Sequence, residues 1–405
     1  MRKIIILLLA LLLCGCQGAA QPEPEVVPEE IIDYSEFFGR KMKVIDDSDL
    51  FVFDGDKMTA CGTALKNSLW NVDSQQGNYL HIADSLFYIR GEAVEKSDRY
   101  YPNRNHLLPW NQNVVTNETY EIQDLKGRVV MSINSSDEYP LFVLDSEDDA
   151  RYGVEINNML YYIPKDQAIL KDADNGTSAV ASDLPVMMYH FFYDASAGES
   201  RIDGNYVEVN EFEQQLDYLN DNKYTGLTMQ ETLYFLTERS QIPVHSYVIT
   251  IDDADPSVHQ YAYPILKEHE INATLFVICG WQEPDMPWEL WEMREAGIEL
   301  QSHSFLMHEY GCEGMGHGGR LLCVAHDEGV EDTKASYAYC DGGFVYCYPF
   351  GDVNDNARQI IIDAGTKMAF TTEPGKVRPG MDLFTLPRVR VHGGNSLDAY
   401  ISALN

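Results

Sequence analysis

Positively charged residues are scarce in this sequence of 405 residues. Lys and Arg number 29 against 64 Asp and Glu, which leaves a formal net charge of -35 at pH 7. A nucleic-acid-binding surface needs the opposite sign because it must neutralise phosphates, so we expect no nucleic-acid partner. Hydrophobic residues still make up 45% of the chain. That share is typical of globular proteins, and the length favours two domains.

Cys-x-x-Cys pairs are absent among the eight cysteines, which argues against the usual structural zinc sites. Cys312 and Cys323 flank part of a Gly-rich loop from 309 to 326 and are candidates for a disulfide that closes it. Spacing alone does not establish this pairing, because a disulfide also requires the two Cα atoms to lie close together.

No long apolar run follows residue 13. The run from Ile4 to Leu13 follows two basic residues and has ten residues, against roughly 20 needed to span a bilayer. It fits a signal peptide. The run ends in Leu-Cys-Gly-Cys at 13–16, which resembles a bacterial lipobox and implies cleavage before Cys16 and a diacylglycerol on its sulfur. We therefore predict a signal peptide over 1–15 and a flexible tether over 16–30. The protein would then be anchored to the cell membrane only through this lipid, facing outside the cytoplasm.

Residues 31–180 have a pattern typical of β-structure. Short apolar segments are separated by turn residues, and helical periodicity is rare. The clearest segments are Leu50–Phe53, Tyr79–Ile82, Leu141–Leu144 and Leu160–Ile163. We predict a small antiparallel accessory domain, which contains no evident catalytic group of residues.

From residue 184 the pattern changes to strands that alternate with helices. Strands are expected over 244–251, 273–279, 298–302, 344–348, 368–372 and 386–391, and helices over 257–269, 287–296 and 354–364. Such alternation favours parallel strands joined by crossover helices, and these can close into a barrel. The prediction is an α/β domain over 184–405 that follows the β-rich domain.

The conspicuous polar residues come directly after expected strands. Asp252 and Asp253 follow the strand at 244, His303 follows the strand at 298, and Pro349-Phe350-Gly351 follows the strand at 344. In α/β folds the carboxyl ends of the strands carry the active site. We therefore expect these residues to gather at one site.

Their chemistry points to a metal ion. Successive strand side chains alternate in direction, so Asp252 and Asp253 are expected to take different roles, one as a ligand and one handling a proton. His303 and His308 are five residues apart, which suits a loop around one ion. One carboxylate and two imidazoles are a common ligand set for catalytic zinc and related ions, and they leave a position for water.

Three motifs then resemble those of one family, the polysaccharide deacetylases (the NodB-homology domain of carbohydrate esterase family four). They are Thr-Ile-Asp-Asp at 250–253, His-Ser-Phe-Leu-Met-His at 303–308 and Tyr-Pro-Phe-Gly at 348–351. The resemblance covers about 184–405. It implies a distorted (β/α) barrel that hydrolyses N-acetyl groups on glucosamine-type glycans. It also implies a divalent metal cofactor, zinc first, with cobalt, nickel and manganese left open.

The resemblance also assigns roles to individual residues. Asp253, His303 and His308 match the metal ligands of the family, and Asp252 matches the general base. Phe350 occupies the position whose backbone N–H would help to stabilise the oxyanion.

Two departures concern side chains around the site. Met307 stands where the family has Ser or Thr, which puts one supporting hydrogen bond in doubt. Cys347 stands where the family has an arginine that orients the base. Arg388 or Arg390 on the last expected strand could replace that arginine, and the sequence leaves the choice open.

The general acid also has two candidates. The usual late histidine of the family has only His392 as a counterpart. The subgroup of biofilm poly-N-acetylglucosamine deacetylases instead carries its acid in a Met-Tyr-His segment near the start of the domain. Met188-Tyr189-His190 resembles that segment. We therefore favour His190 as the acid and keep His392 as the second choice.

Three functions remain open at this point. The first is an active N-deacetylase acting on peptidoglycan or poly-N-acetylglucosamine. The second is a degenerate glycan-binding protein, suggested by Cys347, and the third is a deacylase for another acyl group. A glycosidase is disfavoured, because it would use two separated carboxylates and no histidine ligands. No protein partner is predicted.

Overall fold

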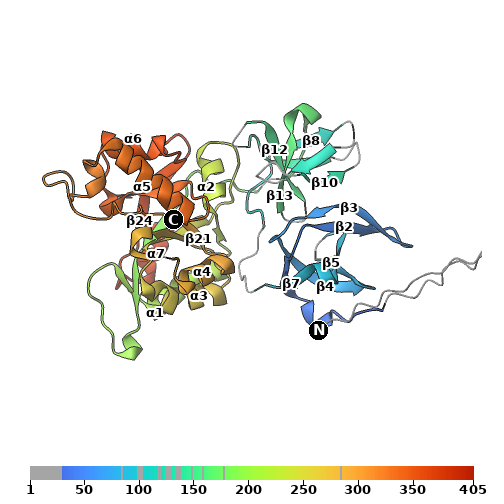
Figure 1. Ribbon diagram of the computed structural model, residues 1–405, viewed down its shortest axis with the longest axis horizontal. Coiled ribbons are helices and arrows are strands. Elements are labelled where there is room, and N and C mark those ends of the chain that lie inside the picture. Colours follow the sequence, from blue (N-terminus) through green and yellow to red (C-terminus); the bar gives the residue numbers. More distant parts are fainter. Residues whose placement is uncertain are drawn as a thin grey trace, which may run out of the picture.

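The computed structural model describes residues 30–405, except 84, 98–103, 117, 119, 124–128, 134–137, 147–148, 157–158, 177 and 283–284. The predicted signal peptide, Cys16 and nearly all of the tether lie outside the described residues. Figure 1 shows the β-rich part beside a larger α/β part that ends at the C-terminus. Among the described helices, none combines the length and hydropathy needed to cross a bilayer.

The α/β part is built on a closed barrel of seven parallel strands. In order around the barrel they are β15 (Val186–Tyr189), β24 (Leu386–Arg390), β23 (Met368–Pro374), β22 (Val345–Cys347), β21 (Glu299–Ser302), β20 (Thr274–Val277) and β19 (Ser246–Asp253). The first strand, β15, pairs with both β24 and β19, and these pairings close the ring. A short strand, β18 (Thr225–Gly226), adds to β19. The predicted (β/α) barrel is confirmed.

Helices cover the outside of the barrel. They are α1 (Val209–Asp221), α2 (Met229–Leu236), α3 (Tyr263–Glu268), α4 (Trp288–Ala296), α5 (His326–Tyr339), α6 (Asp355–Asp363) and α7 (Leu397–Leu404). The helix expected over 257–269 is divided, because a π-helical turn over Val258–Ala262 precedes α3. A small parallel pair, β16 (Phe191–Tyr193) with β17 (Tyr206–Glu208), lies beside the barrel.

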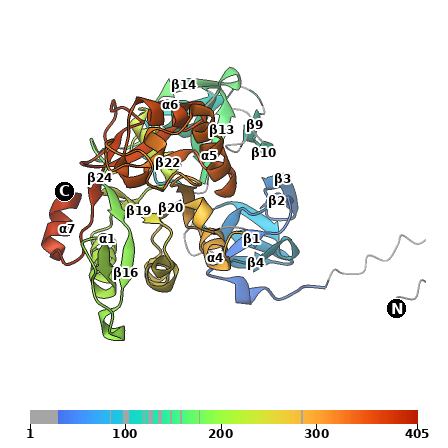
Figure 2. The same ribbon diagram turned by 60° about the vertical axis from the view of Figure 1, so that its left-hand side comes forward.

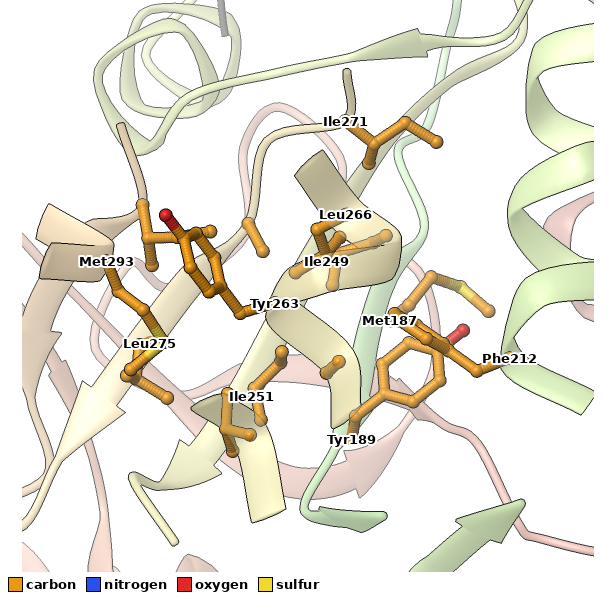
Figure 3. Close-up of a cluster of buried hydrophobic side chains, with 14 of the residues drawn as sticks. Met187, Tyr189, Phe212, Ile249, Ile251, Tyr263, Leu266, Ile271, Leu275 and Met293 are labelled. Atoms are coloured by element: carbon orange, nitrogen blue, oxygen red, sulfur yellow. The ribbon is translucent and has the colours of Figure 1, made fainter. Parts of the chain in front are cut away.

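The strands are held by apolar side chains that meet the helices. Ile249 and Ile251 of β19 lie two residues apart, so both point outward, where they meet Leu266 of α3 (Figure 3). Phe212 of helix α1 belongs to the same apolar cluster. The first turn of α1 is stabilised by a capping box between Glu208 and Glu211. This packing fixes β19, which carries two of the predicted site residues.

The β-rich part is one antiparallel sheet of fourteen strands, drawn as two lobes in Figures 1 and 2. The first lobe has β1 (Arg40–Val44), β2 (Ser48–Phe53), β3 (Met58–Ala64), β4 (Leu69–Gln76), β5 (Tyr79–Ile82), β6 (Phe87–Arg90) and β7 (Val94–Lys96). The second has β8 (Gln112–Thr116), β9 (Tyr120–Gln123), β10 (Val129–Ile133), β11 (Glu138–Val143), β12 (Arg151–Ile156), β13 (Met159–Pro164) and β14 (Ala168–Asp172). The lobes join where β10 pairs with β3. The predicted domain boundaries stay predictions.

The β-rich part packs against the amino-terminal ends of the barrel strands. The hydroxyls of Tyr162 and Tyr234 are 2.9 Å apart, and Glu231 of α2 accepts a hydrogen bond from the backbone N–H of His106. A cavity of about 650 Å³ lies in this interface and reaches Asn272 and Gly343, just before β20 and β22. The carboxyl ends of the barrel strands, where the site residues lie, are therefore at the opposite end of the barrel.

Candidate active site

Three segments with unusual backbone conformation meet at the carboxyl ends of the barrel strands. Asp253 ends β19 with φ 75°, Ser304 follows β21 with φ 79°, and Phe350 lies in the turn after β22 with φ 61°. Positive φ is costly for residues other than glycine and persists only where the surrounding structure enforces it. Such strain is common at functional sites. Here each of the three sequence motifs contains one of these positive-φ residues.

Asp253, His303 and His308 form one cluster. The Nε2 atoms of His303 and His308 lie 3.4 and 3.6 Å from Oδ1 of Asp253. One ligand atom from each of the three residues lies within 4.8 Å of the others, close enough to share one metal ion. Nδ1 of His303 lies 2.8 Å from the carbonyl oxygen of Cys347 and donates to it. That bond turns Nε2 toward the cluster, and in the neutral imidazole Nε2 carries the lone pair, as in metal-binding histidines.

The two imidazoles of the cluster differ in protonation. Burial, together with the neighbouring His303, lowers the pKa of His308 to about 4, so this imidazole is neutral and able to ligate at pH 7. Burial alone would lower the pKa of His303, but Cys347 and Asp253 outweigh burial and raise that pKa well above its ordinary value. A cation bound here would displace the proton of His303, as metal binding to histidine generally does.

Asp252 points to a different partner from Asp253, as the alternation along the strand predicts. Its two carboxylate oxygens each accept a hydrogen bond of 2.7 Å from the guanidinium of Arg388. Burial alone would raise the pKa of Asp252, but Arg388 outweighs burial and holds this pKa below its ordinary range. Cys347 also contacts Arg388, with Nη2 and Sγ 3.0 Å apart. Asp252, His303 and Cys347 form a second potential ligand group, but Arg388 already supplies its positive charge.

The structure separates the two candidate arginines and the two candidate histidines. Arg388 is fully buried against Asp252, whereas Arg390 is exposed and hydrogen-bonds Asn205. His190 lies with Nε2 3.8 Å from Oδ2 of Asp252. His392 is exposed and packs beside Gly204 instead. Arg388 and His190 are therefore brought into the site. Arg390 makes its hydrogen bond outside it, although its charge acts on His190, and His392 packs against Gly204.

Burial sets the protonation preference of His190. It lowers the pKa of this imidazole, and the nearby carboxylates of Asp252 and Asp253 oppose that effect without cancelling it. Near pH 7 the neutral imidazole is therefore favoured, and the protonated form is a stronger acid than an exposed histidine. To act as a general acid, His190 would have to hold a proton when the leaving group departs.

Phe350 places both its backbone and its ring at the site. Its backbone N–H makes no hydrogen bond within the described part of the chain. Its ring centroid lies 4.5 Å from that of His308 and 4.9 Å from that of Tyr310. The ring of Phe350 thus lies beside the cluster, and the oxyanion role of its backbone N–H stays a prediction.

Two buried carboxylates that support the site were not expected from the sequence. Asp332 of α5 accepts from the backbone N–H groups of Phe305 and Leu306, at 3.0 and 2.6 Å, and so fixes the loop between the two histidines. Asp352 accepts from the backbone N–H groups of His317 and Gly319. The position of Asp352 directly after the Pro-Phe-Gly turn is a signal that could have identified it, whereas nothing in the sequence marks Asp332.

The structure also shows how Cys312 and Cys323 are paired and what surrounds Met307. Cys312 and Cys323 form a disulfide, which closes the Gly-rich loop. Met307 is buried in an apolar cluster with Leu321 and Leu322. Packing therefore replaces the hydrogen bond that a Ser or Thr would make there.

A parallel (β/α) barrel with carboxylates and imidazoles gathered at the carboxyl ends of its strands defines a barrel enzyme. Residues 240–369 match the model of the polysaccharide deacetylase family. Over 199 residues the chain is 30% identical to the poly-beta-1,6-N-acetyl-D-glucosamine N-deacetylase of Staphylococcus aureus (strain MRSA252), and the match covers 46% of this chain and 67% of that protein. The chain belongs to the polysaccharide deacetylase family, whose members are hydrolases.

Two solved structures are similar to this chain. The deacetylase PplD of Streptococcus pyogenes, solved in complex with acetate, has 24% identity and a TM-score of 0.48, and the match covers 56% of this chain and 100% of that chain. IcaB from Ammonifex degensii has 25% identity and a TM-score of 0.48, with 56% of this chain and 99% of that chain covered.

Proposed function

We propose that this protein is a metal-dependent N-deacetylase of an extracellular amino-sugar polysaccharide, with poly-N-acetylglucosamine favoured over peptidoglycan. The observation that carries the proposal is the divergence of two adjacent carboxylates. Asp253 faces two imidazoles, whereas Asp252 is held by Arg388. A ligand set beside a fixed base is what metal-assisted hydrolysis requires. The named activity of the Staphylococcus aureus relative supports this choice of glycan.

The residues fit a divalent metal ion. Asp253, His303 and His308 would hold it, and two imidazoles with one carboxylate suit zinc, while cobalt, nickel and manganese accept the same ligands. When bound, the ion would polarise the acetyl carbonyl and lower the pKa of water to roughly 7.

The other residues of the site handle protons and orientation. Asp252 remains a carboxylate because of Arg388, so it can accept a proton from the attacking water. The Phe350 N–H would donate to the oxygen of the acetyl carbonyl as it gains negative charge. His190 would give a proton to the departing nitrogen as the amide C–N bond breaks. The products are acetate and a free amine on the sugar.

A degenerate glycan-binding protein is the second candidate, and its support was the missing arginine at position 347. Arg388 from β24 makes the contact with Asp252 that such an arginine would make. A non-catalytic binder has no use for this buried ion pair beside a set of metal ligands. The geometry therefore favours turnover over binding alone.

Acetate release from N-acetylglucosamine oligomers tests the proposal. The mature chain without Cys16 would be assayed with added zinc or cobalt, with chelator, and as the Asp252→Asn variant. We expect release that chelator stops and that Asp252→Asn abolishes. Absence of release from a protein with one metal ion bound per chain would refute the N-deacetylase and favour a different acyl substrate.

We also propose that the protein is exported and anchored through a lipid on Cys16. The lipobox-like Leu-Cys-Gly-Cys at 13–16 supports this. Incorporation of a labelled fatty acid tests it, and we expect label in the wild type and none in the Cys16→Ser variant. A wild-type protein without label, or a Cys16→Ser protein with it, would contradict the anchor.

A further inference from the structure

An exposed aromatic ring stands next to the proposed metal site. The ring of Tyr310 stacks on that of Phe350 at an interplanar angle of 16°. Tyr310 is nonetheless 74% exposed, so one face of its ring is covered and the other faces solvent. Phe350 in turn contacts His308, one of the proposed metal ligands. The open face of Tyr310 is thus separated from that ligand by a single ring.

The loop that carries Tyr310 is rigidly closed. Tyr310 and Gly319 form a β-bridge, and the backbone N–H of Gly311 donates to the carbonyl of Gly318. The disulfide between Cys312 and Cys323 ties the two arms together. An exposed tyrosine at the tip of an unconstrained loop would instead sample many orientations.

A buried carboxylate anchors the loop from below. Asp352, which follows the turn of Phe350, accepts hydrogen bonds from the backbone N–H groups of His317 and Gly319 and from Nδ1 of His317. Gly316 lies over the same carboxylate with φ +47°, and a Cβ there would collide with Asp352. The loop and the turn are therefore fixed to each other, and with them the two stacked rings.

We propose that Tyr310 forms a sugar-binding subsite, stacking on a neutral N-acetylhexosamine unit next to the one that loses its acetyl group. A pyranose ring has one apolar face of C–H groups, which packs well on the electron-rich face of an aromatic ring. A ring that is held in place before binding loses little entropy when the sugar arrives. This subsite rests on the proposed function, because the deacetylase reaction supplies the identity of the sugar.

Direct binding tests the subsite separately from catalysis. The Kd of an N-acetylglucosamine pentamer would be measured by calorimetry in the Asp252→Asn background, where the oligomer is not consumed. Tyr310→Ala is expected to raise Kd roughly three- to tenfold, from the usual strength of an aromatic contact. Tyr310→Phe keeps the ring and is expected to bind like the parent. Trp291→Ala is the matched control, because Trp291 is also an exposed aromatic, 52% exposed, but it lies on helix α4 and not on the loop of Tyr310.

A second variant acts on the loop and leaves the ring unchanged. Cys312→Ser combined with Cys323→Ser removes the disulfide, and we expect a rise in Kd in the same direction as for Tyr310→Ala. Metal content per chain would be measured for each variant, because a collapsed site would lose metal as well as sugar. Equal metal content with weaker binding identifies loss of the subsite.

The outcomes distinguish this inference from the proposed function. An unchanged Kd for Tyr310→Ala would overturn the subsite, even if the wild-type protein releases acetate normally. Binding that depends on Tyr310 in a protein that releases no acetate would support the subsite and refute the deacetylase. A wild-type protein that neither binds the pentamer nor releases acetate would overturn both.

Discussion

Arg388 and Asp252 form a buried bidentate ion pair across the barrel, with two N–O distances of 2.7 Å. Arg388 comes from the last strand, β24, and its guanidinium also donates to the hydroxyl of Thr250 and to the carbonyl of Thr371. Four hydrogen bonds to oxygen therefore fix one plane of the guanidinium against the carboxylate. This geometry orients Asp252, the proposed base. In the family pattern an arginine at the position of Cys347 has that task.

The first prediction concerns this ion pair. Arg388→Met would leave a carboxylate buried without its counter-charge, because Asp252 is only 2% exposed. Removal of one partner of such a pair typically costs about 3–5 kcal/mol in the free energy of unfolding. We expect that loss in urea unfolding, together with a large fall in kcat for acetate release.

Arg390→Met is the matched control for that experiment. Arg390 lies two residues further along the same strand, but it is exposed. Substitution of an exposed residue away from a buried network usually changes stability by less than about 0.5 kcal/mol. Equal effects of the two substitutions on stability and kcat would contradict the role assigned to Arg388.

The second prediction separates the two adjacent carboxylates. Asp253→Asn weakens the proposed ligand set, so we expect lower metal content after dialysis and activity that excess zinc partly restores. Asp252→Asn leaves the ligands in place, so we expect full metal content with kcat lowered by about 10²–10⁴, the usual contribution of a general base. Metal analysis and kcat measured on the same preparations would check both. Loss of metal in Asp252→Asn, with retention in Asp253→Asn, would reverse the assignment.

The strand ends could be predicted from the sequence, but the choice between paired candidates could not. Arg388 and Arg390 are two residues apart on one strand, so the alternation of side chains places both on the same face. Only the depth along β24 separates them, since Arg388 is enclosed by the barrel and Arg390 emerges among the loops. Depth depends on how neighbouring strands are staggered, and a local pattern does not contain that information.

The two candidate acids are likewise distinguished only by their tertiary surroundings. His190 follows β15 and His392 follows β24, and these strands are paired with Met188 opposite Arg390. The two histidines are therefore equivalent in register. They differ in the segments around them, because His392 packs on the loop at Gly204. That loop follows soon after His190 in the sequence but lies far from His392, so the contact of His392 is a long-range one.

Long-range pairing explains what was missed in the β-rich part. Individual strands such as Tyr79–Ile82 were predicted from short apolar segments and are present as β5. The division into two lobes depends on the pairing of β10 with β3, residues about half the region apart. Such contacts arise from tertiary packing, so strand propensity alone does not predict them.

The third prediction tests the proposed acid. His190→Gln is expected to lower kcat by about 10²–10⁴, the range for loss of an acid or base group, with metal content unchanged. His392→Gln is the matched control, and we expect its kcat to equal that of the wild type, because its contacts lie outside the site. The comparison is made from kcat on one N-acetylglucosamine oligomer. A fall in kcat confined to His392→Gln would transfer the role to that residue.

The fourth prediction concerns pH and the contact between the two parts of the chain. Burial would raise the pKa of Glu231, but the charge and hydrogen bonds of His106 outweigh it and lower the pKa below its ordinary value of 4.5. In the window below pH 4.5 the unfolded chain therefore binds more protons than the folded one, so stability falls as pH falls. The contribution of Glu231 is fully present above pH 4.5 and is lost as pH drops through the folded pKa.

Charge-assisted hydrogen bonds are worth about 1.5–3 kcal/mol. Glu231→Gln should lose stability at pH 7 and show a smaller further loss at pH 4 than the wild type, measured by urea unfolding at both values. Glu238→Gln is the control, because Glu238 is exposed and lies just after the same helix. We expect its stability to equal that of the wild type at both pH values. A Glu231→Gln protein with the pH dependence of the wild type would show that this carboxylate does not stabilise the interface.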